Sequence, residues 1–117
     1  MPIIRRGDVP VEELAGNQSQ PLARGNLGTT SVTVSEVTIP PGGQIGLHIH
    51  PGHEECILIT EGALQARLGD DESTATTGDT VIAPDRVKHS LTNISGSPAK
   101  IIAIFPTTDV QREWLDQ

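Results

Sequence analysis

Short segments rich in isoleucine, valine and threonine recur along most of the chain, and many of them alternate apolar with polar positions. A period of two residues is typical of strands that bury one face. Twelve glycines and nine prolines separate the segments, which favours brief strands joined by tight turns. The pattern predicts an all-β protein with seven strands, at residues 29–39, 44–50, 56–60, 63–68, 80–83, 89–94 and 99–105.

A helical pattern occurs only near the C-terminus, at residues 108–117. Thr108 is a candidate N-cap, and Gln111 follows three residues later, as in a capping box. Val110 and Trp114 lie four residues apart, so they would share one apolar face of a helix. We therefore expect one short C-terminal helix.

The 117 residues are enough for one domain and too few for two. Residues 1–28 mix proline, glycine, glutamine and charged side chains around one short amphipathic piece, and we assign them to an N-terminal arm. The predicted single domain, residues 1–117, then consists of this arm, the strands within residues 29–106 and the helix at 108–117.

The charge balance argues against several classes of partner. Fifteen acidic and eight basic residues give a net charge of −7, and the basic residues are scattered, so we expect no nucleic-acid partner. No apolar run approaches the roughly 20 residues of a membrane-spanning helix. The N-terminus lacks the apolar segment of a secretory signal, and Cys56 is the only cysteine. We expect a cytoplasmic protein without an intrachain disulfide.

Three histidines and one glutamate stand out as candidate metal ligands. His48 and His50 are two residues apart in a predicted strand, so both imidazoles project from one face. Glu55 opens the next strand after a Pro-Gly turn, which places a carboxylate beside that pair once the hairpin closes. His89 begins another strand and could complete the set. Imidazole and carboxylate together suit divalent transition metals.

The spacing of these residues resembles the two sequence motifs of the cupin family. The first motif is matched in order and spacing by Gly42, His48, His50, Glu55 and Gly62. The second motif is matched by Gly78, Pro84, His89 and Asn93. One motif position departs, because Arg86 stands where the family pattern has the glycine of Pro-x-Gly.

The resemblance implies a cupin-type β-barrel, also called a double-stranded β-helix or jelly roll. It also implies that His48, His50, Glu55 and His89 bind one divalent metal, with Fe, Mn, Ni, Zn and Cu all open. The motif spacing selects Glu55 over Glu54, since six residues separate Glu55 from the motif glycine. The alternative is a barrel of the same family that has lost its metal.

Four further residues are candidates for the pocket. His53 lies in the turn between the ligands and would line the pocket mouth or substitute as a ligand, unless it is a solvated turn residue. Arg86 lies in the loop that delivers His89 and would meet a substrate carboxylate or phosphate, unless it is an exposed loop charge. Gln65 and Arg67 share one strand face and would line the cavity only if the apolar face of that strand packs outward.

Four protein ligands leave open positions on a metal that prefers six, so chemistry at the metal is possible. Family resemblance favours a metal-dependent oxidoreductase of dioxygenase type that acts on a small, anionic organic molecule. Two alternatives stay open at this point. One is a redox-neutral isomerase, lyase or decarboxylase, and the other is a metal-binding or sensor module without turnover.

Pointing the ligands inward would turn neighbouring aliphatic side chains outward, and on this basis we expect a homodimer. The side chains expected on the outer surface are Leu47, Ile49, Leu58 and Leu64. The alternative is that the C-terminal helix or the N-terminal residues fold over this surface.

Overall fold

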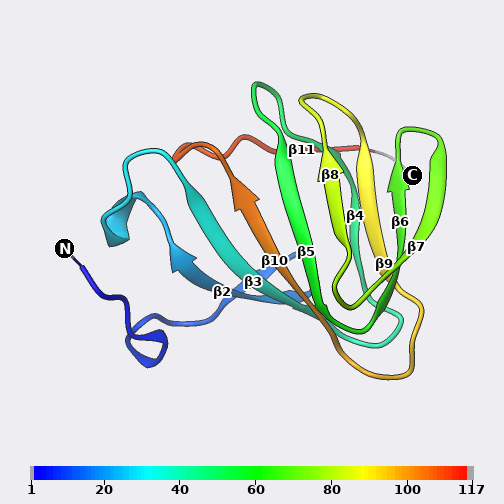
Figure 1. Cartoon of the computed structure of the whole chain (residues 1–117), viewed down its shortest axis with the longest axis horizontal. Helices are drawn as coiled ribbons and strands as arrows, with labels where there is room; N and C mark the ends of the chain where they lie inside the picture. The colour runs from blue at the N-terminus through cyan, green and yellow to red at the C-terminus, as the bar shows by residue number, and fades with distance from the viewer. Residues whose placement is uncertain (1, 116–117) are drawn as a thin grey trace.

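The computed structural model describes residues 2–115 of the protein, and its strands form two antiparallel sheets that pack face to face (Figure 1). Two short 3₁₀ turns, η1 (Arg6–Asp8) and η2 (Gly25–Leu27), flank the first strands. In chain order the strands are β1 (Glu12–Leu14), β2 (Asn17–Ala23), β3 (Thr33–Ile39), β4 (Gln44–Ile49), β5 (Glu55–Glu61), β6 (Ala63–Leu68), β7 (Asp71–Thr76), β8 (Thr80–Ala83), β9 (His89–Asn93), β10 (Ala99–Phe105) and β11 (Glu113–Trp114).

The strand order is that of a double-stranded β-helix. Sheet A has the order β1-β2-β3-β10-β5-β8, and sheet B has the order β11-β4-β9-β6-β7. Most neighbours within a sheet are distant in sequence, so the chain crosses repeatedly between the two sheets. Among the described residues, no helix is long and apolar enough to cross a membrane.

An aliphatic core fills the space between the inner faces of the two sheets. Alternate residues of each strand point inward, as the period of two predicts. Ile57 and Ile59 of β5, Ile101 of β10 and Leu64 of β6 are each at most 2% exposed. Phe105, the one phenylalanine, is also buried at the end of β10.

The seven strands predicted from the sequence are all present, three of them (β6, β8 and β10) with the predicted ends, and four more strands occur. β1 and β2 form within the N-terminal arm and extend sheet A beside β3. β7 begins at Asp71, in a segment for which the sequence pattern predicts no strand. Only Ala75 of β7 is buried, because β7 is the edge strand of sheet B and pairs with β6 alone. An edge strand of this kind leaves little apolar alternation in the sequence.

The predicted C-terminal helix is wrong for the described part of its range, and residues 116–117 lie outside the described residues. The segment after β10 instead crosses to sheet B, drawn in orange to red in Figure 1, and adds β11 to the edge of β4. Trp114 pairs with His48, and the Leu115 N–H donates to the Leu47 carbonyl at 2.9 Å. Pairing satisfies open backbone groups of β4, whereas a helix of about ten residues is marginal on its own.

Two of the four leucine and isoleucine side chains expected to be exposed on the outer surface are buried. Leu64 is fully buried in the core, because the apolar face of β6 packs inward. Leu47 is 4% exposed, and the C-terminal segment is hydrogen-bonded to its backbone. Ile49 and Leu58 are half-buried and face away from the ligands, as expected. The C-terminal segment therefore covers the backbone edge of β4 at Leu47.

A matched pair of glycine substitutions tests the packing at the β5–β6 turn. Gly62 and Gly78 both have a positive φ, 103° and 96° respectively. A Cβ on Gly62 would lie 2.9 Å from the Ala99 Cβ, whereas a Cβ on Gly78 would meet nothing within 4 Å. Both alanine variants carry backbone strain of about 1–2 kcal/mol, and Gly62→Ala adds the steric cost.

We predict that Gly62→Ala lowers the free energy of unfolding by at least about 1 kcal/mol more than Gly78→Ala does, as measured by urea denaturation. Equal destabilisation by the two variants would contradict the close packing of Gly62 on Ala99.

Candidate metal centre

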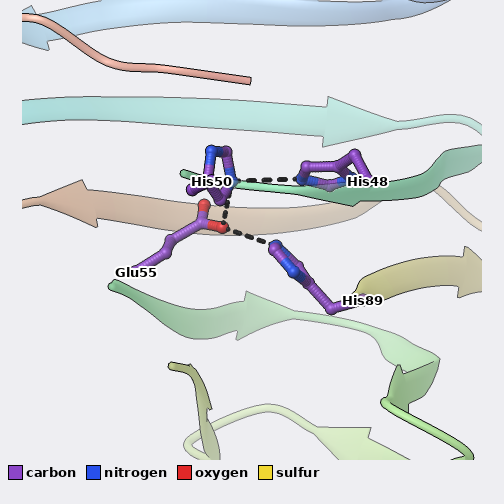
Figure 2. A group of neighbouring side chains, drawn as sticks. All are labelled: His48, His50, Glu55 and His89. Carbon is purple, nitrogen blue, oxygen red and sulfur yellow. Dashed lines mark hydrogen bonds and ion pairs between the residues drawn. The ribbon is translucent and has the colours of Figure 1, made fainter. Parts of the chain in front are cut away.

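The four predicted ligands come from three strands and meet between the two sheets (Figure 2). His48 and His50 come from β4 and the residue that follows it, and His89 opens β9, the neighbour of β4 in sheet B. His48 and His89 are paired directly across these two strands. Glu55 opens β5 in sheet A, so the site joins the two sheets. All four side chains are buried, each at most 4% exposed.

The donor atoms converge on one point. All four lie within 4.8 Å of one another. The Nε2 atoms of His48 and His50 are 3.2 Å apart, and the Glu55 Oε1 is 3.0 Å from the Nε2 atoms of both His50 and His89. Two ligands at about 2.1 Å from a shared ion and at right angles to each other would be about 3.0 Å apart. The spacing therefore fits neighbouring ligands of one metal ion.

A backbone carbonyl holds the far side of each imidazole. The Nδ1 of His48 donates to the Gly46 carbonyl at 2.6 Å, and that of His89 donates to the Val87 carbonyl at 2.9 Å. The Nδ1 of His50 donates to the Gln111 carbonyl at 2.7 Å. Because a carbonyl only accepts, each Nδ1 carries a proton, and each Nε2 faces the centre, where it can donate to a carboxylate or, without a proton, bind a cation. Such hydrogen bonds orient metal-binding histidines in proteins.

The charge state of the cluster also suits a cation. Burial, followed by the charge of His89, lowers the pKa of His48 to about 4, so this ring is neutral near pH 7. Burial alone would raise the pKa of Glu55, but hydrogen bonds from His50 and His89 lower it to about 2. A carboxylate and imidazole lone pairs that face one another repel unless protons or a cation lie between them. One divalent ion would satisfy all four donors at once, so the residues fit the metal.

A cavity of about 200 Å³ opens from the ligands between the sheets. His48, Glu55 and His89 form its polar end, and aliphatic side chains and Phe105 form most of its walls. Two residues of the C-terminal segment, Val110 and Arg112, also line it. The size predicts a small substrate.

Of the other predicted pocket residues, His53 lies outside this cavity. Its Nδ1 is 3.0 Å from the Glu54 carbonyl, and its Nε2 accepts a hydrogen bond from the Gln111 N–H at 3.1 Å. Its ring stacks on that of His50, with centroids 5.3 Å apart. His53 thus holds the C-terminal segment whose Gln111 carbonyl orients His50, and it is not part of the four-residue ligand group.

Arg86 is exposed in the loop before β9, and its nearest carboxylate is that of Asp85, at 3.7 Å. Its φ of 64° is left-handed, which explains why the family pattern has glycine at this position. Gln65 and Arg67 face outward from β6, where Gln65 accepts from Thr74 and Arg67 donates to the Gly69 carbonyl. None of these three residues lines the cavity. Gln65 and Arg67 lie outside it because the apolar face of β6 packs inward.

The neighbours of Glu55 in sequence also point away from the ligands. Glu54 is exposed, and Cys56 is half-buried on the opposite face of β5. This agrees with the choice of Glu55 from motif spacing and alternation.

Arg112 is the cavity residue that sequence reasoning missed. Assigning residues 108–117 to a helix placed Val110 and Trp114 on one face and left Arg112 without a role. The same residues also fit a period of two, in which Val110, Arg112 and Trp114 alternate with polar positions. That period was the available signal, because Val110 and Arg112 share the face that lines the cavity.

Comparison with known proteins agrees with the fold. The cupin domain family matches residues 35–105. Protein SchB of Streptomyces halstedii is 29% identical over 101 residues, which are 86% of this chain and 73% of that protein. The family match at residues 35–105 covers more than half of the chain, so this protein belongs to the cupin family.

Two solved structures show the same fold at low sequence identity. The oxalate decarboxylase of Lactobacillus farciminis has a TM-score of 0.83 at 20% identity, over 93% of this chain and 34% of its own. The polyketide cyclase RemF of Streptomyces resistomycificus has a TM-score of 0.81 at 20% identity, over 100% of this chain and 88% of its own. This chain thus spans about a third of the decarboxylase chain and most of the cyclase.

Two glutamate variants test the ligand assignment. Glu55→Gln removes a charged donor from the cluster, whereas Glu54→Gln changes an exposed side chain of the same type. We predict that Glu55→Gln weakens Zn(II) binding at least about tenfold and that Glu54→Gln leaves it unchanged, measured by competition with a chelating dye. His89→Ala should also abolish stoichiometric binding while the circular dichroism spectrum stays that of the folded barrel.

The reverse ranking of the two glutamates would mean that the β4–β5 register is shifted by one residue. Full Zn(II) occupancy in His89→Ala would remove this histidine from the ligand set.

Proposed function

We propose that this protein is a metal-dependent oxidoreductase of dioxygenase type that acts on a small organic anion. The observation that carries the proposal is the convergence of three Nε2 atoms and one carboxylate oxygen beside a largely aliphatic cavity, which three of these residues, His48, Glu55 and His89, line. A purely structural metal site is closed by its ligands, whereas this one faces a space large enough for a small molecule.

In this proposal His48, His50, Glu55 and His89 hold one divalent metal. When bound, the ion supplies Lewis acidity and, as iron or copper, one-electron redox chemistry. The protein contributes the rest: the carbonyl-bound imidazoles keep the ligand geometry fixed, and the aliphatic walls limit the access of water. The charge of the centre would be positive, because the ligand set carries a single negative charge.

The scarcity of acid–base groups in the cavity favours oxygen-dependent chemistry. Apart from the ligands and Arg112, the titratable side chains that line it among residues 2–115 are Glu12 and Glu13 of β1. Both are exposed, so they lie at the rim. Glu12 pairs with Arg24 at 3.0 Å, and Glu13 accepts from the Gly16 N–H at 2.7 Å. A reaction driven by the metal needs no general base from these walls.

A redox-neutral reaction is the second candidate. The proteins of similar fold include an oxalate decarboxylase and a polyketide cyclase, which supports this class. Here Glu12 or Glu13 would have to exchange its present hydrogen bond for a proton taken from substrate.

Oxygen consumption tests the choice between these classes. We predict that protein loaded with Fe(II) consumes dioxygen when supplied with a member of a panel of small carboxylic and enolisable acids. Protein loaded with Zn(II), and Fe(II)-treated Glu55→Gln, should be inactive, while Glu54→Gln should match the wild type. Anaerobic turnover with Zn(II) or Mn(II) would support the redox-neutral class instead, and ligand binding without turnover under any condition would indicate a binding module.

We also propose a homodimer formed through the outer face of sheet A. Leu58, Ile82, Ile102 and Ile104 lie on this face across β5, β8 and β10, half-buried or, for Ile82, 53% exposed. Burying such a face removes apolar surface from water. Light scattering should give a mass near twice 12.4 kDa, and Ile102→Glu should shift it to the monomer. A wild-type mass near 12.4 kDa would reject the dimer.

A further inference from the structure

We propose that Arg112 recognises a carboxylate group of the substrate, so that the ligand of this site is a small carboxylic acid bound between a guanidinium and the metal. This inference rests on the proposed function and adds the residue that selects the substrate class. The sequence predicts this role for Arg86, but Arg86 is exposed and does not line the cavity.

Arg112 belongs to the segment between β10 and β11 and lines the same cavity as His48, Glu55 and His89. Its Nε is buried and has no hydrogen-bond partner within residues 2–115. Buried donors in folded proteins are almost always paired, so an unpaired guanidinium N–H at a cavity calls for a partner. A carboxylate is the partner that matches the guanidinium geometry, because two parallel N–H···O bonds can form.

Arg112 differs from the arginines that form ion pairs with carboxylates of the protein. Arg6, Arg24 and Arg67 each lie beside a carboxylate of the protein, as does Arg86. Among the described residues, Arg112 is the one basic side chain that lines the cavity. Burial lowers its pKa and the Glu55 charge opposes that shift, but a guanidinium stays charged at any physiological pH. The cavity lining therefore includes one guanidinium even before a metal binds.

Trp114 holds this guanidinium in place. The Arg112 Cζ lies 5.6 Å from the centre of the Trp114 ring, and that ring lies 5.0 Å from the ring of His48. Stacking on an aromatic face fixes the plane of the guanidinium while its N–H edge stays free to donate. Arg112 and the ligand His48 are thus linked through one aromatic side chain.

Charge and size restrict the substrate further. A divalent ion, the Glu55 carboxylate and Arg112 sum to two positive charges, which one or two carboxylates would neutralise. Glu12 and Glu13 at the rim disfavour an anion that extends out of the cavity. The cavity of about 200 Å³ has no room for a large acid. These limits favour a short acid with a second oxygen near its carboxylate, such as a 2-hydroxy acid, a 2-oxo acid or a short dicarboxylate.

Calorimetric titration of the Mn(II)-loaded protein with glycolate, pyruvate and oxalate tests this, with glycolamide as the uncharged analogue of glycolate. We expect Arg112→Gln to weaken binding of the acids about tenfold to a hundredfold while glycolamide binding stays the same. Arg112→Lys should retain part of the affinity, because it keeps the charge and loses the paired donors. Arg86→Gln is the control and should bind like the wild type.

Manganese content and thermal melting of each variant check that the site and the fold are intact. Equal loss of glycolate and glycolamide binding in Arg112→Gln would mean that Arg112 only supports the cavity wall, and this would overturn the proposal. So would wild-type affinity in Arg112→Gln, or a wild type that binds none of the three acids at millimolar concentration.

Failure of the proposed function gives a different result. A protein that binds the acids through Arg112 but turns none of them over would refute the enzyme and keep the recognition residue. If the wild type does not retain Mn(II), the same titrations are followed by Trp114 fluorescence in the metal-free protein, because Trp114 is the only tryptophan and contacts Arg112. Acid-dependent change in the wild type and its loss in Arg112→Gln would support the proposal, and no change in the wild type would overturn it.

Discussion

Hydrogen bonds from three buried Nδ1 atoms to backbone carbonyls determine which way the imidazoles of this site face. The carbonyls belong to Gly46, Val87 and Gln111, which lie in β4, in the loop before β9 and in the C-terminal segment. With each Nδ1 proton donated outward, the Nε2 lone pairs converge beside a carboxylate inside a double sheet. The arrangement is unfavourable without protons or a cation at its centre, and the chemistry of the protein follows from that.

The C-terminal segment connects the metal centre to the substrate cavity. Its Gln111 carbonyl orients His50, and its Gln111 N–H is held by His53. The next residue, Arg112, turns into the cavity, and Trp114 packs against the ring of His48. One short segment therefore supports a ligand, supplies the cationic side of the cavity and closes the edge of β4. In the function proposed above, we therefore expect a change in this segment to alter metal binding and substrate selection together.

The sequence was most informative where geometry is local. Strand periodicity places His48 and His50 on one face, and motif spacing separates Glu55 from Glu54, so the four members of the buried cluster could be predicted residue by residue. The C-terminal segment could not, because Val110 and Trp114 fit both a helical and a strand period. The open edge of β4, a tertiary feature, decides between them. The same holds for Arg112, whose place in the cavity depends on a strand pairing that spans more than sixty residues.

The proposed metal centre requires one particular tautomer of each ligand histidine, and nitrogen-15 NMR of the Zn(II)-loaded protein tests this requirement. The chain has four histidines, which makes the spectrum simple to assign by single substitutions. We predict that His48, His50 and His89 each show a protonated Nδ1 and a metal-bound Nε2, and that the Nε2 of His53 shows no metal shift. Metal coordination through the Nδ1 of any histidine would contradict these tautomers. A metal shift at His53 in place of one of the other three histidines would contradict the ligand assignment.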